Sequence, residues 1–169
     1  RSNLLVMAWF KKTRKPIEPT GEKPSRVPEG LWVKCPGCTQ IIYNKDLDKN
    51  QQVCPKCGHH FRISAAERLR ALFDDGNWTE HFQNLTSNDP LKFTDTKPYR
   101  NRLKETIGKT GMKDAVIVAT GRLDGLDIVV AAMEYAFIGG SMGVVVGEKI
   151  TRAIEMAIEG RKPVIIVSC

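Results

Sequence analysis

Four of the five cysteines in this 169-residue chain fall into two C-x-x-C pairs. The pairs Cys35-Pro-Gly-Cys38 and Cys54-Pro-Lys-Cys57 are separated by residues 39–53, which is the spacing of a zinc ribbon. Each pair predicts a tight turn whose two sulfurs face one ion, and four thiolates leave no open position for water. We therefore predict that one structural Zn²⁺ is bound by Cys35, Cys38, Cys54 and Cys57.

Other uses of these residues are conceivable. Two disulfides would fit the same cysteine count, but we expect no secretory signal, because the basic residues follow the apolar patch 4–10 instead of preceding it. A redox-active C-x-x-C would normally occur once, beside a βαβ pattern. His59 and His60 could replace a cysteine ligand, yet we expect both at the surface of the ribbon. Cys169 is expected to be a buried apolar residue on a strand.

A second candidate site is a loop of small residues, and its members are Gly139, Gly140, Ser141, Met142 and Gly143. Such residues at the start of a helix let backbone N–H groups approach an anion or a thioester closely. The same glycines could serve only the tight packing of a helix on a sheet. No P-loop or dinucleotide-binding fingerprint is present. Phosphates could be met by Arg152, Arg161 and Lys162, although such charges are more often solvated. His81 has no predicted role.

The elements that position this loop predict an α/β arrangement. Ala115–Arg122 and Leu126–Met133 are rich in β-forming residues and flank the hairpin dipeptide Asp124-Gly125. The apolar positions after Gly143 recur with helical spacing to about Glu159, and Gly160 is expected to cap that helix. Val164–Val167 is a continuous apolar run, which is typical of a strand buried on both faces.

Two further helices are predicted upstream. Ser64 and Glu67 form a capping box at the start of a helix that Asp75-Gly76 ends. A second helix is predicted from Pro98 to Ile107, ended by Gly108.

Composition divides the chain into three segments. Residues 1–30 are predicted to be a flexible basic leader, 31–62 the ribbon, and 63–169 the α/β part. Within the ribbon, short strands are expected at 41–43 and 52–53, joined by a polar turn over 44–50. The net charge of +7 lies almost entirely in residues 1–60, which carry eleven Lys and Arg against five Asp and Glu. No apolar run reaches the roughly 18 residues that a membrane span requires.

The order of these parts resembles the carboxyltransferase beta subunits of bacterial and plastid acetyl-CoA carboxylase. The resemblance rests on Pro28–Cys35, Val53–His60, Asp89–Phe93 and, above all, Glu134–Gly143. It implies an α/β fold in which a four-cysteine zinc ribbon precedes the first β-β-α units of a crotonase-like (ClpP/crotonase) domain. It also implies that the chain is a truncated N-terminal fragment, inactive alone, with the oxyanion glycines expected beyond Cys169 and no catalytic residue before it.

The resemblance further implies the reaction and the partners. The carboxyl group of carboxybiotin, held on a biotin carboxyl carrier protein, is transferred to acetyl-CoA to give malonyl-CoA for fatty acid biosynthesis. A carboxyltransferase alpha subunit (α₂β₂) and an ATP-binding biotin carboxylase complete the complex, in the cytoplasm or a plastid stroma. Loop 139–143 then lines the acyl-CoA site. The alternative is a zinc-ribbon module that binds nucleic acid, with Tyr43 and Phe61 stacking on bases and lysines contacting phosphates.

Overall fold

A computed structural model of the chain describes residues 30–169, which form parts of two compact units. The first unit ends at His60, and the second comprises Phe61–Cys169. The predicted basic leader therefore lies outside the described residues, apart from Gly30. No helix in the described part of the chain is long and apolar enough to cross a membrane.

The ribbon unit contains a short antiparallel pair, β1 (Trp32–Lys34) and β2 (Ile41–Tyr43), followed by helix α1 (Asn44–Lys49). The polar turn predicted over 44–50 is thus wrong. Leu47 is the one apolar residue in that stretch and is only 2% exposed. Burial of this side chain stabilises the helix. The strand predicted at 52–53 is also wrong, because Val53 forms only an isolated bridge with His60.

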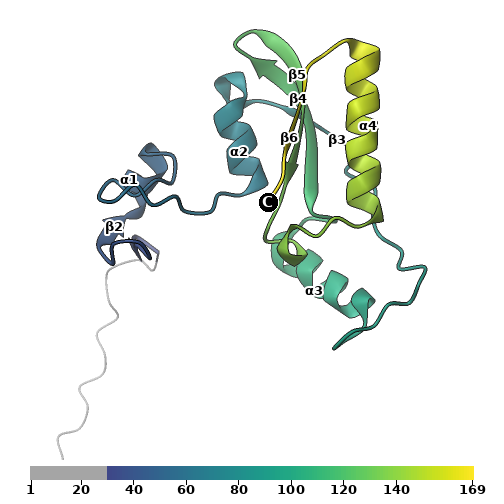
Figure 1. The fold of residues 1–169 in the computed structure, drawn as a ribbon, viewed down its shortest axis with the longest axis horizontal. Helices are drawn as coiled ribbons and strands as arrows, with labels where there is room; N and C mark the ends of the chain where they lie inside the picture. Colours follow the sequence, from purple (N-terminus) through teal and green to yellow (C-terminus); the bar gives the residue numbers. More distant parts are fainter. Residues whose placement is uncertain (1–29) are drawn as a thin grey trace, which may run out of the picture. The chain divides into compact units, whose positions relative to one another are not determined.

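The second unit is built on a four-stranded sheet in the order β3-β4-β5-β6 (Figure 1). The first three strands are antiparallel, and β6 runs parallel to β5. Their bounds are Thr79–His81, Val116–Leu123, Leu126–Met133 and Val164–Val167. The predicted hairpin is confirmed: Asp124 and Gly125 have φ of 49° and 77°, the left-handed pair that a two-residue hairpin turn requires. Asp74 accepts hydrogen bonds from both of their N–H groups, at 3.0 and 2.9 Å.

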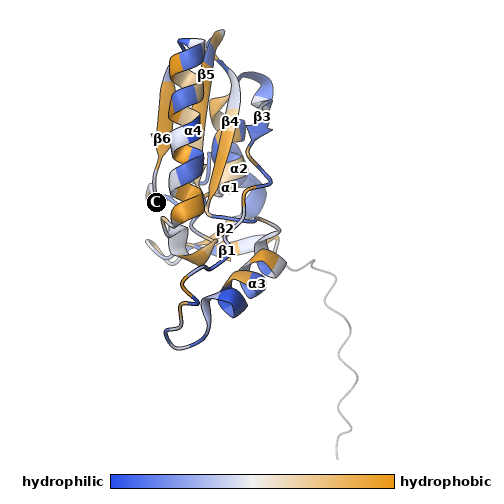
Figure 2. Ribbon diagram, turned by 90° about the vertical axis from the view of Figure 1, so that its right-hand side faces the viewer, coloured by the Kyte–Doolittle hydropathy of each residue, from blue (hydrophilic) through white to orange (hydrophobic). Residues whose placement is uncertain are grey.

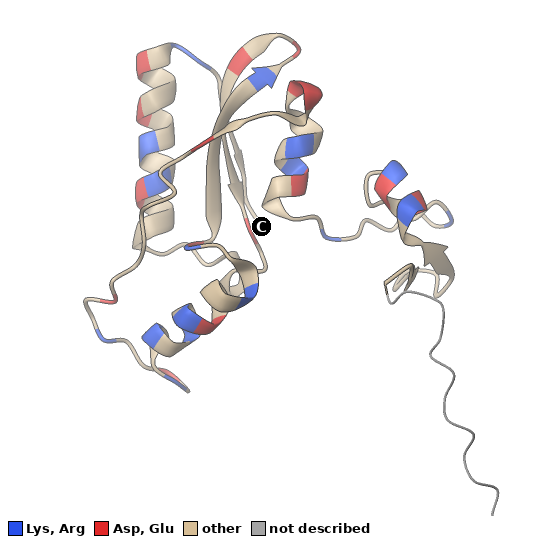
Figure 3. Ribbon diagram, turned by 180° about the vertical axis from the view of Figure 1, so that it is seen from behind, with Lys and Arg blue, Asp and Glu red and all other residues tan. Residues whose placement is uncertain are grey.

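Helices cover both faces of this sheet (Figures 1 and 2). Helix α4 (Val144–Gly160) packs on one face, and α2 (Ala65–Leu72) packs on the other. Because side chains alternate along a strand, successive residues of β4 and β5 enter different cores. The α4 side takes Val116, Val118, Val129, Ala131 and Met133, and the α2 side takes Ile117, Ala119, Ile128, Val130 and Ala132. Charged residues are frequent on the helices and sparse on β4 and β5 (Figure 3).

The capping box of α2 is confirmed, and the helix ends at Leu72, just before a 3-10 turn over Asp74–Gly76. Helix α3 (Tyr99–Thr110) is longer than predicted, since it continues through Gly108 and stops at Gly111. Gly111 has φ of 70°, the left-handed conformation of a helix C-terminus. Helix α4 also ends differently, because the residue in that conformation is Arg161 (φ 49°) and not Gly160.

The environment predicted for the last strand is wrong. Val164 and Ile166 are 40% and 46% exposed, because β6 lies at the edge of the sheet and pairs with β5 alone among the described strands. Cys169 is exposed and follows β6, so its predicted burial on a strand is wrong as well. Its sulfur lies against Gly140, where a Cβ would collide with it.

Candidate functional site

The two C-x-x-C segments fold into turns of the same design. In the first, Cys35 N donates to Gln40 O (2.9 Å) and Thr39 N donates to Cys35 O (2.8 Å). In the second, Cys54 N donates to His59 O (2.8 Å) and Gly58 N donates to Cys54 O (2.9 Å). The residue after each second cysteine adopts a positive φ, 60° at Thr39 and 73° at Gly58. Each turn therefore directs its pair of sulfurs to the same side.

The four sulfurs form one cluster, in which all ligand atoms lie within 4.8 Å of one another. Cys35 Sγ is 3.7 Å from Cys57 Sγ, and Cys38 Sγ is 3.8 Å from Cys54 Sγ. A tetrahedral site with Zn–S bonds of about 2.3 Å has sulfur–sulfur edges of about 3.8 Å. The residues present therefore fit Zn²⁺ in size, number and chemistry, and the site is closed to a further ligand.

The pKa values of the cysteines also favour a bound cation. Burial raises the pKa of Cys54, but hydrogen bonds from backbone N–H groups, including that of Lys56, outweigh it and lower this pKa to about 7. The His59 N–H favours the thiolate of Cys57, but burial and the neighbouring thiols raise its pKa to about 12. Four thiolates cannot coexist here without a bound positive charge, which a metal ion supplies.

The histidines next to the cluster are not part of it, as the sequence predicts. His60 is exposed, whereas His59 is half buried rather than on the surface. A Cβ on Gly37 would lie 3.1 Å from His59 Cβ and 3.3 Å from Cys57 Sγ. The two turns therefore pack closely, and a glycine at position 37 allows their approach.

The glycine loop links β5 to α4. After Phe137 it forms a 3-10 turn, Ile138–Gly140, with φ of 49°, 66° and 73° at its three residues. Gly143 is the N-cap of α4 and provides no side-chain cap. The first N–H groups of a helix have no partner within the helix, so this end of α4 presents backbone donors.

A largely apolar cavity of about 260 Å³ adjoins this end of the helix. Ser141 and Gly143 of the predicted loop line it, together with the first residues of α4. The remaining walls come from the segment after β5, from the segment before α3, from α3 itself and from the residues just before β4. They include Phe137, Ile138, Leu91, Phe93, Tyr99, Leu103 and Ala115. A cavity of this kind excludes water around an apolar ligand while offering N–H groups at one end.

The structure gathers only some of the predicted loop residues at the cavity. Gly139, Gly140 and Met142 do not line it; Gly140 is buried against Cys169, and Met142 is 66% exposed. Among the predicted phosphate contacts, Arg152 pairs with Glu148 at 2.8 Å. Arg161 and Lys162 follow the far end of α4, about 25 Å along the helix from the loop. The structure does not bring these cations together with the loop.

His81, which has no predicted role, gains a partner in the sheet. Its Nε2 lies 2.7 Å from Thr120 Oγ1 on the neighbouring strand β4.

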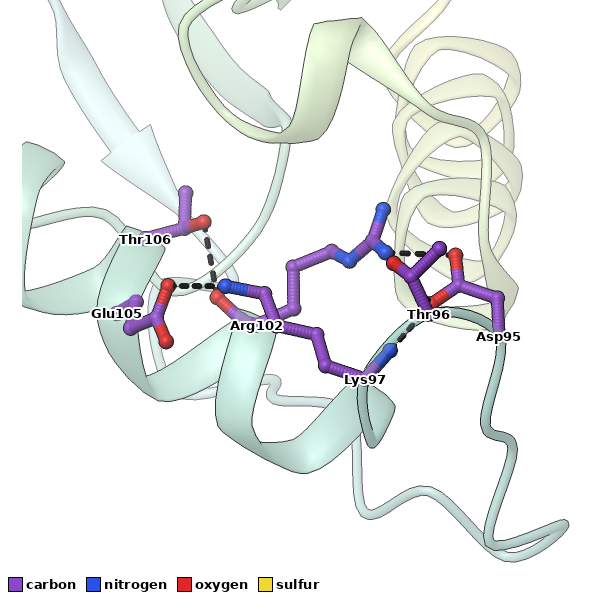
Figure 4. Close-up of polar contacts among 6 residues, drawn as sticks. All are labelled: Asp95, Thr96, Lys97, Arg102, Glu105 and Thr106. Atoms are coloured by element: carbon purple, nitrogen blue, oxygen red, sulfur yellow. Dashed lines mark hydrogen bonds and ion pairs between the residues drawn. The ribbon is translucent and has the colours of Figure 1, made fainter.

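The segment that closes one side of the cavity is tied to α3 by exposed ion pairs (Figure 4). Arg102 donates to both oxygens of Asp95, at 2.6 and 2.7 Å, and Lys97 pairs with Glu105 at 2.6 Å. The Lys97 N–H and the Arg102 charge hold the pKa of Asp95 below its usual value. Because exposed pairs contribute about 0–1 kcal/mol each, they define where the segment runs more than they stabilise the fold.

A buried ion pair beside the cavity was not predicted. Lys149 Nζ lies 2.6 Å from Asp114 Oδ2, with side chains 2% and 7% exposed, and also donates to Val116 O at 3.3 Å. The other Asp114 oxygen accepts the Val116 N–H at 2.9 Å. The sequence holds one indication of this pair: Lys149 falls on the apolar face of α4, where a side chain is expected to be buried.

Comparison with known families gives two matches within the chain. Residues 32–57 match the acetyl-CoA carboxylase zinc finger domain, and residues 64–168 match the carboxyl transferase domain. The predicted order of a four-cysteine zinc ribbon region followed by a carboxyl transferase domain in an α/β fold is confirmed.

Curated relatives are similar along almost the whole chain. The acetyl-coenzyme A carboxylase carboxyl transferase subunit beta of Pedobacter heparinus is 49% identical over 96% of this chain and 58% of that protein. The protein of the same name from Pelobacter propionicus is 51% identical over 96% of this chain and 57% of that protein. The chain thus spans less than two thirds of the length of these relatives.

Solved structures show a partial likeness. A Pseudomonas malonate decarboxylase MdcD-MdcE hetero-dimer is 32% identical over 62% of this chain and 35% of that chain, with a TM-score of 0.40. The transcarboxylase 12S structure is 20% identical over 72% of this chain and 20% of that chain, with a TM-score of 0.48.

Proposed function

Because this chain belongs to the carboxyl transferase domain family, we propose that it acts as the beta subunit of an acetyl-CoA carboxylase carboxyltransferase. It serves the transfer of a carboxyl group from carboxybiotin to the methyl carbon of acetyl-CoA, which gives malonyl-CoA for fatty acid biosynthesis. The observation that carries the proposal is the presence, in one chain, of the acetyl-CoA carboxylase type of zinc finger and a carboxyl transferase domain. Relatives that bear this name support it at about half identity.

The cavity at the start of α4 is the best place for the acyl-CoA thioester in this chain. Removal of a methyl proton next to a thioester places negative charge on the thioester oxygen, and fixed N–H donors in a dry site stabilise that charge. Apolar side chains such as Phe93 and Leu103 exclude water there, while Ser141 and Gly143 bring backbone close to the ligand. Carboxybiotin supplies the carboxyl group, and we assign no proton transfer to the described residues.

The ribbon has a structural role in this proposal. Cys35, Cys38, Cys54 and Cys57 hold one Zn²⁺, whose closed coordination keeps it out of the chemistry. The remaining components are a carboxyltransferase alpha subunit in an α₂β₂ assembly, a biotin carboxylase and a biotin carboxyl carrier protein.

The test is malonyl-CoA formation by the full-length protein assembled with its alpha subunit, compared with two tryptophan variants. Val144 lines the cavity and is 85% exposed, so Val144→Trp obstructs the cavity without disturbing the core. We expect it to raise the KM for acetyl-CoA about tenfold or more, which corresponds to about 1.4 kcal/mol. The control Ile158→Trp changes an exposed residue of the same helix, outside the cavity, and leaves the KM unchanged.

Two results would contradict the proposal. Absence of malonyl-CoA from the unmodified assembly rejects the activity. Equal KM values for the two variants reject the position of the acyl-CoA site.

A second candidate function, nucleic-acid binding by the ribbon, is favoured by one surface. Trp32 is 56% exposed and its ring lies 5.0 Å from that of Tyr43, in a hollow that Lys56 also lines. An exposed Trp32 ring and a half-buried Tyr43 ring beside a lysine suit stacking on single-stranded bases. Binding that weakens steeply with salt and is lost in Trp32→Ala supports this function; binding that Trp32→Ala leaves unchanged excludes this surface.

A further inference from the structure

Glu134 is a buried carboxylate at the end of β5 that plays no part in the proposed chemistry. It is only 8% exposed, although carboxylates are rarely buried without a partner. Each of its oxygens accepts one backbone hydrogen bond: Oε2 from the Ala65 N–H at 2.8 Å, and Oε1 from the Ala136 N–H at 3.0 Å. Two charge-assisted bonds of this kind offset the loss of hydration.

The first of these bonds lies at the start of α2. Ala65 is the first residue of that helix, and its N–H is one of the donors that no helical carbonyl can satisfy. Ser64 caps the Glu67 N–H instead, so the two acceptors serve different donors. The negative charge of Glu134 also suits the positive end of the helix dipole.

The second bond lies at the start of the glycine loop. Ala136 opens a run of tight turns in which Phe137 N donates to Glu134 O, Gly140 N to Phe137 O and Ser141 N to Ile138 O, at 3.0–3.2 Å. These bonds join residues three positions apart, so they fix the shape of the run but not its orientation relative to the rest of the α/β unit. The bond from Ala136 N to the Glu134 carboxylate connects this run, through Ala65, to a helix about seventy residues earlier.

A neighbouring contact joins the same two segments. The guanidinium of Arg62 lies 3.8 Å from the centre of the Tyr135 ring, so the residues just before α2 also cover the residue after Glu134. Such a cation–π contact at an exposed ring contributes modestly, but it is independent of the carboxylate.

We propose that Glu134 is a positioning residue: its carboxylate ties the start of the glycine loop to the N-terminus of α2 and so fixes how the loop meets the cavity. Arg62 and Tyr135 reinforce the same connection. The effect on catalysis rests on the proposed function, whereas the effect on the loop does not.

The experiment compares Glu134→Gln and Glu134→Ala with Glu67→Ala in the full-length protein. Glu67 also accepts an N–H at the start of α2, from Ser64, and its hydrogen bonds with Ser64 stay within the capping box, so it is the matched control. Amide hydrogen exchange over residues 136–143 is the direct measurement. We expect Glu134→Gln to accelerate it about tenfold and Glu134→Ala to accelerate it more, because bonds to a charged acceptor are lost. Glu67→Ala leaves it unchanged.

Kinetics of the assembled enzyme give the second measurement. Glu134→Gln raises the KM for acetyl-CoA with little change in kcat, whereas Glu67→Ala changes neither. If exchange in 136–143 stays at the unmodified rate while the start of α2 loosens, Glu134 is only a helix cap and the inference is wrong. If the unmodified assembly makes no malonyl-CoA, the proposed function fails, but the exchange result still decides the role of Glu134.

Discussion

The ribbon and the α/β unit of this protein are stabilised in opposite ways. Four residues are buried in the range 30–60. Two are the apolar residues Ile42 and Leu47, and the other two are the cysteines Cys35 and Cys54. The α/β unit contains buried clusters of eleven and eight residues on the two faces of its sheet. A segment as small as the ribbon cannot offset its loss of chain entropy with so little apolar burial. We therefore expect the folding of the ribbon to depend on its metal site and that of the α/β unit to depend on packing.

Metal removal is expected to have the largest effect, and to affect the ribbon alone. Cys35→Ser, or a zinc chelator, should unfold the ribbon and leave the α/β unit intact, because a structural zinc ion contributes about 10–16 kcal/mol of binding free energy. Amide exchange should become fast throughout residues 31–60 and stay slow in β4 and β5, while the metal content falls from one zinc per chain. Cys169→Ser, outside the cluster, is the control. Protection of 31–60 that survives metal loss would show that the ribbon folds by packing.

The buried ion pair is the point where the α/β unit departs from simple packing. Lys149→Met leaves Asp114 buried without its cation, and we expect the free energy of unfolding to fall by about 3–5 kcal/mol. Denaturant unfolding measures this loss, and zinc content should not change. The double variant Asp114→Asn/Lys149→Met removes both charges and keeps an acceptor for the Val116 N–H, so it should recover most of the stability. A double variant as unstable as the single one argues against the charge as the cause.

Phe73, the residue after α2, packs closely on the sheet at Gly121, and substitutions there measure how much packing contributes to the α/β unit. A Cβ on Gly121 would lie 2.5 Å from a Phe73 ring carbon, so Gly121→Ala should cost about 1–3 kcal/mol. Thermal unfolding measures the cost, and adding Phe73→Leu should relieve part of it. Gly147→Ala in α4, where nothing lies within 4 Å, should instead stabilise by about 0.5–1 kcal/mol. Equal effects at the two positions would exclude the ring contact as the reason.

The smallest expected change in stability comes from exchanging residues between equivalent positions of the two cysteine turns. Thr39 occupies with φ of 60° the position that Gly58 occupies with φ of 73°. A β-branched residue in this conformation is strained by about 1–3 kcal/mol. Glycine removes the strain but loses more chain entropy on folding, which costs about 0.5–1 kcal/mol. Thr39→Gly should therefore raise the stability of the zinc-bound ribbon by about 1 kcal/mol, and Gly58→Thr should lower it. Zinc competition measures both, and a weaker site in Thr39→Gly contradicts the strain.

The sequence predicts the local features of this protein well, because local features have local causes. The cysteine spacing, the Ser64 capping box and the Asp124-Gly125 turn each depend on residues within a few positions of one another, and the structure has all three turns or caps where expected. Features that depend on distant segments could not be predicted. The burial of Leu47 creates a helix in a polar stretch, and the edge position of β6 exposes residues that its apolar run would bury.

The candidate sites show the same difference between features with local causes and features that depend on distant segments. The four sulfurs meet as expected, whereas only Ser141 and Gly143 of the glycine loop reach the cavity. The other cavity walls come from segments up to about fifty residues earlier, and no periodicity relates them to the loop. Glu134 and Lys149 gain their partners only after folding, from Ala65 and Asp114. Our sequence analysis assigned a role to neither residue, because each gains its meaning from a partner distant in the sequence.

The carboxylate of Asp74 that holds the hairpin turn has a consequence for biosynthesis. It precedes the turn it binds by fifty residues, so it leaves the ribosome seconds earlier at synthesis rates of about 5–20 residues per second. A hairpin forms in about 1–10 μs, so β4 and β5 can pair, and their turn can bind the Asp74 carboxylate, as soon as β5 has also emerged. The order of translation thus favours docking of the nascent hairpin before α4 and β6 are made.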